Sequence, residues 1–301
     1  MAPVTIAASL RESTQTLAAA GSESPRLDAE LLLGHVLGVG RATLIAEGES
    51  GVSASQQAEF SALIEQRARG VPVAYLRGLK EFYGLVLSVD ERALIPRPET
   101  ETLVELALEV IGRRLTAAPR PADAKPLLVW DVGTGSGAIA VALAVESRRR
   151  GFGGNVIFRA TDISVDALAL ALENAVAHAV ADVITFAIAD VAEMPDSERA
   201  DVMTANLPYV ASDDLPQLPV AASYEPPVAF DGGSDGLTFV RQLIGQLPSA
   251  LVPGGTALLE IGSDQADAVV ALCPPGWQMV IHDDLAAWPR VVELTRGDGD
   301  Y

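Results

Sequence analysis

The residues best suited to bind an amide lie at the end of one short apolar segment. The run 201–205 is mostly apolar and stops at Asn206-Leu207-Pro208-Tyr209. Pro208 cannot donate to a sheet ladder, and its ring favours an extended conformation at Leu207. We therefore expect a buried strand whose carboxyl end presents a carboxamide, free carbonyl oxygens and an aromatic ring. Ligands bind at this end of the strands in open α/β sheets, although the same residues would also suit a simple strand end.

A glycine-rich loop, Asp131-Val132-Gly133-Thr134-Gly135-Ser136-Gly137, follows another apolar run and precedes a helical pattern. Its glycines let the backbone bend and approach a ligand without a Cβ clash. The spacing differs from the dinucleotide fingerprint G-x-G-x-x-G, and a carboxylate at 131 would repel a pyrophosphate. We predict a cationic or hydroxyl-bearing ligand such as S-adenosyl-L-methionine, with a tight turn alone as the alternative. The candidate binding residues are Asp131, Gly133, Thr134, Gly135, Ser136 and Gly137.

Two further acids follow the next two apolar runs. Asp162 comes about 25–30 residues after the glycine loop, where a carboxylate can bind both hydroxyls of a ribose. Asp190 follows the run 183–189 and can accept from an adenine amino group, with the Val191 backbone beside it. The alternatives are structural, with Asp162 as the N-cap of a helix starting at Ser164 and Asp190 as a loop cap.

The Asn206 motif suits the transfer of a methyl group to a planar amide. An amide nitrogen is a poor nucleophile, so the site must hold it close to the methyl donor and in line with it. The Asn206 side-chain oxygen and the Leu207 carbonyl can accept the amide hydrogens, and Tyr209 can stack on the planar group. A sulfonium is already activated, so no general base is needed before transfer. We predict Asn206, Leu207, Pro208 and Tyr209 as catalytic, and Asn206 also as part of the cofactor site.

Metal, disulfide and hydrolase chemistry are not indicated. The three histidines are scattered and no Cys/His cluster has metal-ligand spacing, so we expect no metal. Ser136 lies in no G-x-S-x-G elbow. The single cysteine, Cys273, excludes an intrachain disulfide and fits a reducing cytoplasm, which is the predicted location.

The composition indicates a globular protein with an acidic body. The chain has 301 residues, 49% of them hydrophobic, and a net charge of −19. Residues 1–80 are near neutral, so the acidic excess falls on residues 81–301. Such a body repels phosphate, which weighs against direct binding of nucleic acid. No apolar run approaches ~18 residues and no basic region opens the chain, so we expect neither a membrane span nor a secretory signal.

Residues 1–80 are predicted to form a small helical domain without strands. Apolar residues at helical spacing follow Ser24-Pro25, and Ser53 can cap a second helix that runs to Arg69. We expect this domain to recognise the substrate, with a stabilising appendage as the alternative.

Residues 81–100 are predicted to be a hairpin and linker. Tyr75, Leu76 and the apolar residues from 82 to 89 suggest two short strands, with turns near Gly78 and Gly84. Pro96-Arg97-Pro98 makes a stiff linker. Glu99 and Glu101 are expected in the first turn of a helix that runs to about Arg114, and residues 117–126 in an exposed loop.

From residue 127 the chain alternates strands and helices, so residues 101–301 are predicted to form an α/β catalytic domain. The expected strands are 127–132, 156–161, 183–189, 202–205, 256–261, 277–283 and 291–295. The expected helices are 137–148, 164–178, 237–247 and 266–272, with Gly254-Gly255 as a turn. This order predicts a mostly parallel sheet covered by helices, with an antiparallel hairpin at one edge.

Together these motifs resemble the HemK/PrmC family, the protein-(glutamine-N5) methyltransferases that act on peptide chain release factors. The resemblance runs over essentially the whole chain, and residues 96–101 separate it from the sister family that methylates a ribosomal protein. The motifs that carry it are Asp28 to Leu33, Phe82-Tyr83-Gly84, Leu94 to Glu101, Asp131 to Gly137, Asp162-Ile163-Ser164, Asn206 to Tyr209, Tyr224-Glu225-Pro226, Asp231 to Leu237 and Glu293 to Arg296.

The resemblance implies a class I, Rossmann-like methyltransferase fold with a helical N-terminal domain. It implies methyl transfer from S-adenosyl-L-methionine to the glutamine of a Gly-Gly-Gln loop in a release factor, with S-adenosyl-L-homocysteine as product. By position, Gly133 to Gly137 would hold the methionine part of the cofactor and Asp162 the ribose. Asp190 and Val191 would hold the adenine, and Asn206 to Tyr209 the glutamine amide. We expect a monomer.

One residue departs from the family pattern. The family tetrapeptide is Asn-Pro-Pro-Tyr, and Leu207 replaces the first proline. The 207 carbonyl remains available, but the rigidity of the ring is lost and a backbone N–H is gained. We therefore expect weaker pre-organisation rather than lost activity. The alternatives are the same fold acting on a ribosomal-protein glutamine or a nucleic-acid adenine, or a paralogue that binds cofactor without turnover.

Overall fold

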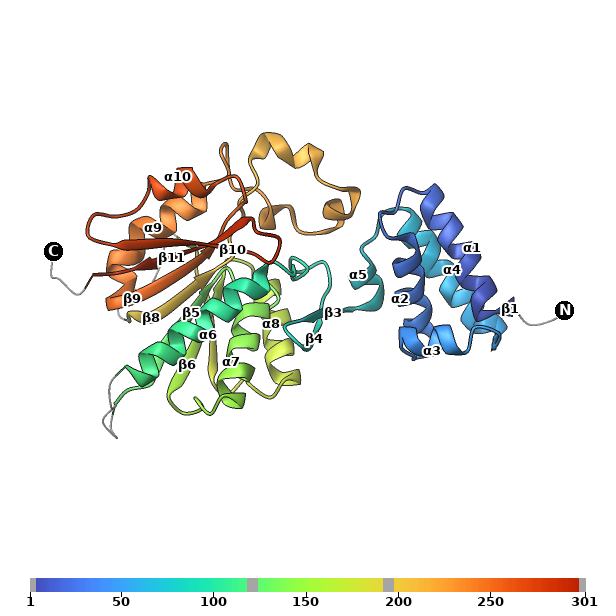
Figure 1. Cartoon of the computed structure of the whole chain (residues 1–301), viewed down its shortest axis with the longest axis horizontal. Helices are drawn as coiled ribbons and strands as arrows, with labels where there is room; N and C mark the ends of the chain where they lie inside the picture. The colour runs from blue at the N-terminus through green and yellow to red at the C-terminus, as the bar shows by residue number, and fades with distance from the viewer. Residues whose placement is uncertain (1–3, 118–123, 192–197, 298–301) are drawn as a thin grey trace. The chain divides into compact units, whose positions relative to one another are not determined.

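The computed structural model describes residues 4–117, 124–191 and 198–297, which form two units (Figure 1). One unit comprises Met1–Leu79 and Leu218–Tyr224, and the other Lys80–Gln217 and Glu225–Tyr301. The hydrophobic core of each unit is built from its own residues. No helix in the described ranges is long and apolar enough to cross a membrane.

The N-terminal unit is a cluster of helices around leucine and phenylalanine side chains. The helices are α1 (Ile6–Ala19), α2 (Pro25–Leu37), α3 (Arg41–Ala46), α4 (Ala54–Ala68) and α5 (Val73–Arg77). Leu17, Leu33 and Phe60 are fully buried among them. Ser53 and Gln56 form a capping box at the start of α4, where each side chain binds the backbone N–H of the other residue. The two helices predicted here, behind Ser24-Pro25 and Ser53, are confirmed.

Two predictions for this region are wrong. Residues 1–80 do contain strands, because β1 (Val4–Thr5) pairs antiparallel with β2 (Gly51–Val52). Two-residue strands show no alternation, so the sequence carries no signal for them. Tyr75 and Leu76 belong to α5 rather than to a strand, since Gly78 adopts a left-handed conformation that ends a helix of five residues.

Residues 218–224 group with the N-terminal unit although they are distant from it in sequence. The Tyr224 hydroxyl donates to the carbonyl of Arg69 at 3.1 Å. Gly70 has φ +103°, and a Cβ there would lie 2.6 Å from Cγ1 of Val220. The chain therefore needs glycine at 70 both for its backbone conformation and for the close approach of Val220.

The second unit contains a seven-stranded sheet in the order β10-β11-β9-β8-β5-β6-β7. Its strands are β5 (Leu127–Val132), β6 (Val156–Asp162), β7 (Ile184–Ile188), β8 (Ala200–Ala205), β9 (Leu251–Glu260), β10 (Gln278–Asp283) and β11 (Pro289–Thr295). Strands β5 to β9 are parallel, whereas β11 runs antiparallel to both β9 and β10. The predicted parallel sheet with an antiparallel edge hairpin is confirmed.

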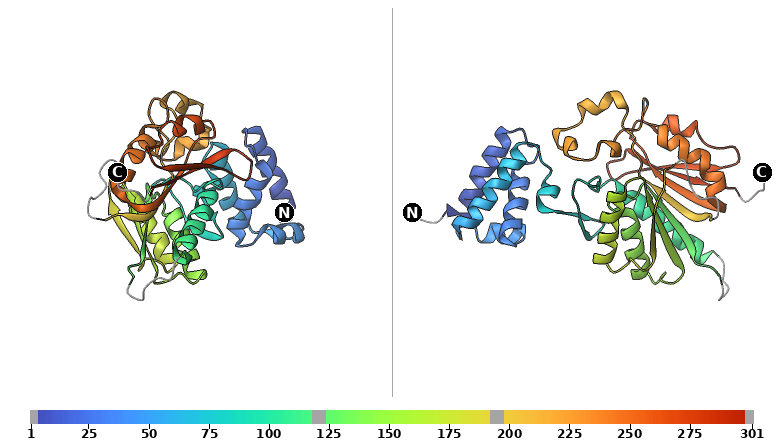
Figure 2. Two further views of the ribbon diagram at one scale, coloured as in Figure 1. Left: turned by 60° about the vertical axis from the view of Figure 1, so that its left-hand side comes forward. Right: turned by 180° about the vertical axis from the view of Figure 1, so that it is seen from behind.

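Helices cover both faces of this sheet (Figures 1 and 2). They are α6 (Thr100–Thr116), α7 (Ala138–Arg149), α8 (Val165–Ala177), α9 (Thr238–Ala250) and α10 (Ala266–Val270). Val129 packs with residues of α6 and α7, whereas its neighbour Trp130 packs with residues of α9. Successive strand residues point to opposite faces, so the near-continuous apolar runs of the sequence follow from burial on both sides.

The predicted hairpin is confirmed as β3 (Leu79–Phe82) paired with β4 (Leu85–Ser88). Glu99 is the N-cap residue of α6 and only Glu101 lies in its first turn, where its carboxylate accepts from the N–H of Tyr83 at 2.9 Å. The expected loop 117–126 lies largely outside the described residues. Short 3-10 segments, η1 (Ser212–Gln217), η2 (Val220–Tyr224) and η3 (Pro227–Ala229), follow β8.

Gly254-Gly255 is not a turn before a strand but part of β9, so this prediction is wrong. The ladder between β8 and β9 shifts register between Ala200, which pairs with Leu251, and Val202, which pairs with Thr256, so the regular pairing is interrupted across these glycines. A Cβ on Gly255 would lie 2.8 Å from the carbonyl oxygen of Val252. These glycines therefore allow a close backbone approach within the strand rather than a chain reversal.

The strand order reverses between β5 and β8. The chain moves outward from β5 through β6 to β7, returns to β8 on the other side of β5, and continues to β9. The crevice at the carboxyl ends of the strands at such a switch point is the usual ligand site of doubly wound sheets. Both the glycine loop and the Asn206 tetrapeptide begin there, directly after β5 and β8.

Candidate functional site

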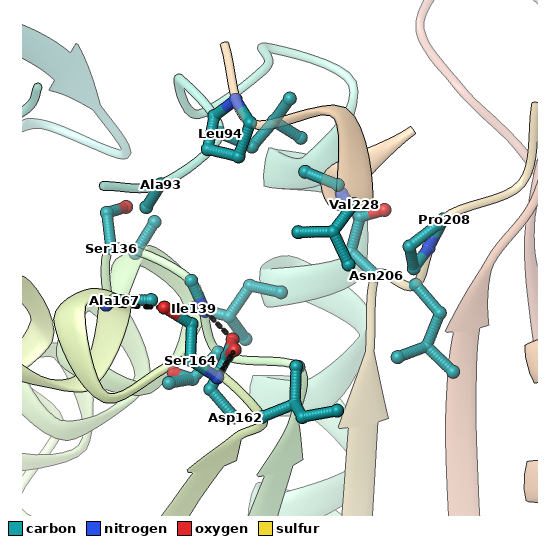
Figure 3. Close-up of a pocket in the computed structure, with 18 of the residues that line it drawn as sticks. Ala93, Leu94, Ser136, Ile139, Asp162, Ser164, Ala167, Asn206, Pro208 and Val228 are labelled. Atoms are coloured by element: carbon teal, nitrogen blue, oxygen red, sulfur yellow. Dashed lines mark hydrogen bonds between the residues drawn. The ribbon is translucent and has the colours of Figure 1, made fainter. Parts of the chain in front are cut away.

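A cavity of about 210 Å³ lies at the carboxyl ends of β5, β6 and β8 (Figure 3). Ten residues predicted from the sequence line it: Gly133, Thr134, Gly135, Ser136, Asp162, Asp190, Val191, Asn206, Leu207 and Pro208. Asp131, Gly137 and Tyr209 do not line it, although Asp131 and Gly137 both bind Thr134, which does. The cavity therefore brings together the glycine loop, the two acids and most of the tetrapeptide.

Glycine is required at two positions of the glycine loop. Gly133 has φ +69°, and a Cβ there would lie 2.8 Å from Cδ2 of Leu207. Gly137 has φ +79°, and a Cβ there would lie 2.9 Å from Cβ of Ala171 in α8. Because Gly133 and Gly137 have no side chain, the loop can pack closely against Leu207 of the tetrapeptide and against α8.

Asp162 ends β6 and faces the cavity. Its Oδ2 accepts from the Gly135 N–H at 2.8 Å and its Oδ1 from the Ser164 N–H at 2.9 Å. Burial raises the pKa of Asp162, and these backbone donors oppose that rise. The N-cap of α8 is Ser164, whose hydroxyl accepts from Ala167, so Asp162 is not the cap of this helix. Each Asp162 oxygen keeps a lone pair for a ligand hydroxyl.

Asp131 lies under the glycine loop and is almost completely buried. Its Oδ2 accepts from the Thr134 hydroxyl at 2.6 Å, and its Oδ1 from the Thr204 hydroxyl at 2.9 Å. Burial raises the pKa of Asp131 to about 7, while the two hydroxyl donors favour its charged form. This side chain ties the loop after β5 to the neighbouring strand β8.

Asn206 lies on the cavity wall with its carboxamide held from one side. Its Nδ2 donates to the Thr100 hydroxyl oxygen at 3.1 Å. The carboxamide oxygen, Oδ1, takes no part in this hydrogen bond. Leu207 is 4% exposed and packs in the core beside Val132 and Leu237. The residue that replaces the family proline is thus a buried core residue as well as a lining residue.

Tyr209 points away from the cavity and toward the end of β9. Its hydroxyl lies 3.5 Å from Oε1 of Glu260, and its carbonyl accepts from Gln265 Nε2 at 2.9 Å. Burial and the adjacent Glu260 raise the pKa of Tyr209 to about 12. The tyrosine is therefore a neutral phenol at physiological pH.

A second wall of the cavity was not assigned a role from the sequence. It comes from residues before and at the start of α6 and from residues after η2. The lining residues are Arg92, Ala93, Leu94, Pro96, Arg97, Thr100, Pro226, Val228 and Ala229. The motifs Leu94 to Glu101 and Tyr224-Glu225-Pro226 contain most of them, and these motifs were the signal available.

The buried carboxylate of Glu225 joins the two parts of this wall. Its Oε1 accepts from Arg97 at 2.6 Å, and its Oε2 accepts from the Ile95 N–H at 2.9 Å. The Glu225 side chain is 2% exposed and Arg97 35% exposed, so the pair forms at the edge of the core. Breaking such a buried pair leaves an uncompensated charge.

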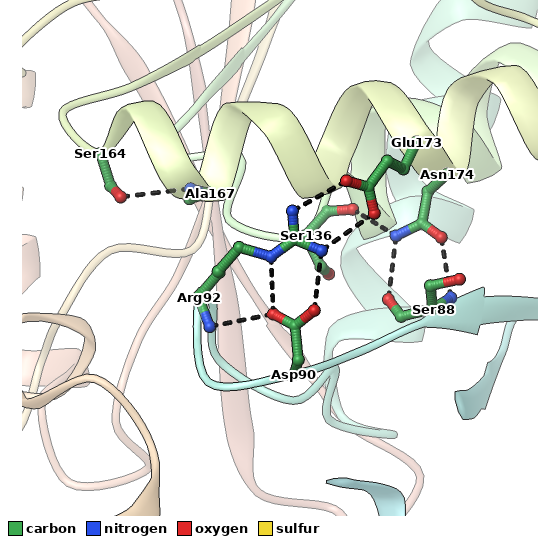
Figure 4. A network of polar contacts seen from close by, with 8 residues as sticks. All are labelled: Ser88, Asp90, Arg92, Ser136, Ser164, Ala167, Glu173 and Asn174. Carbon is green, nitrogen blue, oxygen red and sulfur yellow. Dashed lines mark hydrogen bonds and ion pairs between the residues drawn. The ribbon is translucent and has the colours of Figure 1, made fainter. Parts of the chain in front are cut away.

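A polar network holds the same wall against the glycine loop (Figure 4). Arg92 binds Asp90 at 2.7 Å and Glu173 of α8 at 2.8 Å. Asn174, which is 1% exposed, donates from Nδ2 to the carbonyls of Ser88 and Ser136 at 3.0 and 2.9 Å. Its Oδ1 accepts from the Ser88 N–H at 2.7 Å. One carboxamide thus links α8, the end of β4 and the glycine loop.

The charges of the cavity favour a cation or a polyhydroxylated ligand over a phosphate. Both arginines that line it, Arg92 and Arg97, are already paired with carboxylates. Asp162 and Asp190 contribute negative groups to the wall. Within the described ranges, no group of His, Cys, Asp or Glu could hold a metal ion.

Comparison with known proteins identifies the family. Residues 8–78 match the PrmC N-terminal domain, and residues 124–266 match a methyltransferase domain. The release factor glutamine methyltransferase of Coxiella burnetii is 38% identical over 296 residues, covering 96% of this chain and 99% of the relative. The chain belongs to the release factor glutamine methyltransferase family. The relative from Xylella fastidiosa is 43% identical over 256 residues, covering 85% of this chain and 87% of its own.

Membership of the release factor glutamine methyltransferase family confirms the resemblance to HemK/PrmC and the predicted fold class. The chain is a methyltransferase with an α/β methyltransferase domain and a PrmC N-terminal domain. The solved catalytic domain of hMettl16 shares this fold with a TM-score of 0.52 at 14% identity, covering 82% of this chain and 83% of that one. That likeness concerns the fold alone.

Proposed function

We propose that this methyltransferase transfers a methyl group from S-adenosyl-L-methionine to the side-chain nitrogen N5 of glutamine in the Gly-Gly-Gln loop of a peptide chain release factor. The orientation of Asn206 carries the proposal. Its Nδ2 is held by Thr100 at 3.1 Å, which leaves Oδ1 as an acceptor on the cavity wall. An amide NH₂ is a group that needs such an acceptor. Relatives that span nearly the whole chain carry the corresponding name.

The residues of the cavity fit S-adenosyl-L-methionine. Asp162 keeps lone pairs for the ribose hydroxyls, and the carboxylates on the wall suit the positive amino and sulfonium groups. We assign the glycine loop to the methionine part of the cofactor and Asp190 with Val191 to the adenine. Asp131 would act indirectly, by fixing the loop through Thr134. When bound, the cofactor supplies a methyl group already activated on sulfur and leaves as S-adenosyl-L-homocysteine.

The tetrapeptide would hold the glutamine amide for transfer. The Asn206 Oδ1 and the Leu207 carbonyl would accept hydrogen bonds from the two amide hydrogens, which become acidic as the nitrogen attacks. Transfer would give a cationic N-methylated amide, which becomes neutral when one of these hydrogens is lost as a proton to solvent. Fixing both hydrogens also orients the nitrogen, and orientation is the main requirement for a weak nucleophile. Pro208 closes the wall beside them. Tyr209 would support the tetrapeptide without contacting the substrate, since its hydroxyl faces Glu260 rather than the cavity.

The remaining assignments concern the whole protein. We propose that residues 1–80 recognise the release factor, because their own core makes them a separate unit and they match the PrmC N-terminal domain. We further propose a monomer that works in the cytoplasm without direct contact to nucleic acid. The free thiol of Cys273 supports the cytoplasmic location, and the net charge of −19 supports the absence of contact with nucleic acid.

A labelled-transfer assay tests the reaction. The protein is incubated with a release factor and methyl-labelled S-adenosyl-L-methionine, and the Gly-Gly-Gln peptide is analysed by mass spectrometry. Asn206→Ala should reduce transfer by about 100-fold or more, since it removes an acceptor that orients the nucleophile. Cofactor affinity, measured by calorimetry, should change less than about twofold because the other cofactor contacts remain.

Asn155→Ala is the matched control, because Asn155 is exposed and precedes β6 away from the cavity. It should leave both transfer and affinity unchanged. Loss of both properties in Asn206→Ala would contradict the role assigned to this residue. Absence of label on the glutamine, with an active family member as positive control, would overturn the proposal. Label on a ribosomal protein or an adenine, or cofactor binding without transfer, would select one of the alternatives.

A further inference from the structure

Residues 231–237, Asp-Gly-Gly-Ser-Asp-Gly-Leu, lie directly beside the tetrapeptide, and the reaction as proposed so far does not use them. Val210, the residue after the tetrapeptide, pairs with Asp231 in an isolated β-bridge. The Val210 N–H donates to the carbonyl of Phe230 at 3.0 Å, and the Val210 carbonyl accepts from the Gly232 N–H at 2.8 Å. None of residues 231–237 lines the cavity. The segment therefore adjoins the tetrapeptide without forming part of the proposed ligand site.

Two glycines of this segment allow the backbone of the tetrapeptide to come close. A Cβ on Gly232 would lie 2.7 Å from the carbonyl oxygen of Pro208. Gly236 has φ +72°, and a Cβ there would collide with the carbonyl oxygen of Tyr209. The carbonyls of Pro208 and Tyr209 thus both face the segment, and a side chain at either glycine would displace them.

The buried side chain of Gln265 holds the Tyr209 carbonyl beside Gly236. Gln265 is 9% exposed, and its Nε2 donates to the carbonyls of Tyr209 at 2.9 Å and Gly236 at 3.4 Å. Its Oε1 accepts from the Gly262 N–H at 2.8 Å. A backbone N–H can only donate, so the bond from Gly262 determines which end of the carboxamide faces Tyr209. One side chain therefore connects the tetrapeptide, residues 231–237 and the loop after β9.

These contacts restrict the Leu207 carbonyl because of the proline that follows it. The peptide unit between Leu207 and Pro208 is planar, and the proline ring fixes φ at about −65°. The Leu207 carbonyl can then turn relative to Tyr209 only by rotation about ψ of Pro208, and this rotation also turns the Pro208 carbonyl. The Pro208 carbonyl packs against Gly232, and the next carbonyl is bound by Gln265, so the rotation is hindered.

We propose that Gln265 and residues 231–237 together restrain the backbone of Pro208 and Tyr209, and that Gln265 is a positioning residue for the Leu207 carbonyl. The inference rests on the proposed function, which assigns this carbonyl to a hydrogen of the substrate amide. A proline at position 207 would restrict the same carbonyl from its N-terminal side, through its own φ. Gln265 acts from the C-terminal side and so replaces part of the rigidity that leucine lacks.

Gln265→Glu tests the inference because it keeps the shape of the side chain and the acceptor for Gly262 but removes both donors to the carbonyls. We expect kcat to fall by about tenfold or more, since a small displacement of a group that orients the nucleophile costs a large factor in rate. Cofactor affinity should change less than about twofold, because Gln265 does not line the cavity. Gln265→Met removes the same donors without adding a charge and should have the same effect on kcat.

The same two substitutions at Gln278 are the matched controls. Gln278 is exposed in β10 and does not line the cavity, so Gln278→Glu and Gln278→Met should leave kcat as in the wild type. Thermal melting of each variant, followed by circular dichroism, verifies that the compared proteins are folded at the assay temperature. Wild-type kcat in the folded Gln265 variants would overturn the inference.

The Leu207→Pro background separates a positioning role from general support of the fold. Because a proline at 207 restricts the same carbonyl, Gln265→Glu and Gln265→Met should each lower kcat by less than about threefold in Leu207→Pro. A group that only supports the fold would cost the same factor in both backgrounds. An equal loss of kcat with leucine and with proline at position 207 would therefore overturn the inference.

A measurement without substrate separates this inference from the proposed function. The bond between Pro208 and Tyr209 is the only Pro-Tyr bond in the sequence, so labelling with carbonyl-¹³C proline and ¹⁵N tyrosine gives one coupled amide signal in NMR spectra. This signal should be sharp in the wild type and in both Gln278 variants. It should broaden through microsecond-to-millisecond exchange in both Gln265 variants, because the restraint on the two carbonyls is lost. An equally sharp signal in the Gln265 variants would overturn the inference, even where transfer is observed.

Failure of the wild type to methylate a release factor would instead reject the proposed function. The labelled signal would still decide whether Gln265 restrains the backbone of the tetrapeptide, so the two failures are distinguishable.

Discussion

At the scale of single residues, Leu207 has two functions that compete. Its carbonyl belongs to the tetrapeptide, while its side chain is 4% exposed and packs beneath the glycine loop. The family proline would be stiffer but would fill less of this space. Gly133 is complementary to the leucine, because any Cβ at 133 would lie 2.8 Å from Leu207 Cδ2. Compared with proline, leucine at position 207 therefore makes the motif less rigid and fills the core better.

Leu207→Pro should separate these two effects. Methyl transfer should hold or rise, because the ring pre-organises the carbonyl at 207. The free energy of unfolding should fall by about 1–2 kcal/mol, because a buried side chain becomes smaller. Transfer is measured with the labelled cofactor and stability by urea denaturation. Leu207→Ala is the control that loses the packing without gaining the ring, and it should be less stable and no more active.

A clear loss of transfer in Leu207→Pro, with the fold intact, would show that the leucine side chain itself serves catalysis. That result would contradict the expectation that the carbonyl is what matters at this position.

At the scale of elements, helix α8 positions the glycine loop from outside the sheet. Gly137 admits Ala171 of α8 at close range, and Asn174 of the same helix binds the carbonyl of Ser136. The same carboxamide binds the backbone of Ser88 at the end of β4. The glycine loop, which lines the cavity, and the end of β4 thus both depend on one helix for their geometry (Figure 4).

Asn174→Asp should weaken cofactor binding. The aspartate can still accept from Ser88, but it cannot donate to the carbonyls of Ser88 and Ser136 and would place a charge against them. Unpaired buried polar groups cost about 1–3 kcal/mol each, so we expect the dissociation constant of S-adenosyl-L-methionine to rise by about tenfold or more. Isothermal calorimetry measures it below the melting temperature of the variant.

Asn155→Asp makes the same chemical change at an exposed turn and should leave the affinity as in the wild type. Wild-type affinity in Asn174→Asp would mean that the glycine loop holds its shape without α8.

At the scale of the whole molecule, the protein has two units with separate cores. Leu33 is buried in the core of the N-terminal unit, and Leu243 of α9 in a core of the methyltransferase unit. The cavity at the carboxyl ends of the strands, where we propose that the cofactor binds, is lined by residues of the methyltransferase unit. We therefore expect cofactor binding to stabilise the methyltransferase unit and to leave the stability of the N-terminal unit unchanged.

Calorimetric unfolding should show two transitions rather than one. S-adenosyl-L-methionine at about 100 times its dissociation constant should stabilise one of them by about 2.7 kcal/mol. Leu243→Ala should lower the transition that responds to cofactor, and Leu33→Ala should lower the other, each by about 2–5 kcal/mol. A single transition that both variants shift equally would mean that the two cores unfold as one cooperative unit.

Local signals in the sequence were sufficient for most of the sheet and for placing the glycine loop on the cavity wall. Apolar runs bounded by glycine, proline or acids predicted all seven strands of the sheet. Central strands such as β5 and β8 are apolar almost throughout because they are buried on both faces, whereas the edge strand β10 has no buried residue. The glycine loop and Asn206 follow two of these strands directly, so parallel alignment was enough to place them at one edge. The same local rules missed β1 and β2, which are too short to show a pattern.

Only the tertiary structure decided which distant residues complete the site. Glu225 meets Arg97 and Ile95 across about 130 positions, and Thr100 meets Asn206 across 106. No periodicity encodes such pairs, because they depend on strand order and on which polar groups the core leaves unsatisfied. The burial of Asp131 and Glu260 likewise results from tertiary packing. Burial determines whether a carboxyl group is accessible to a ligand or contacts only neighbouring protein groups. The sequence thus named the groups that could contact the substrate, and the folded chain determined how they are held.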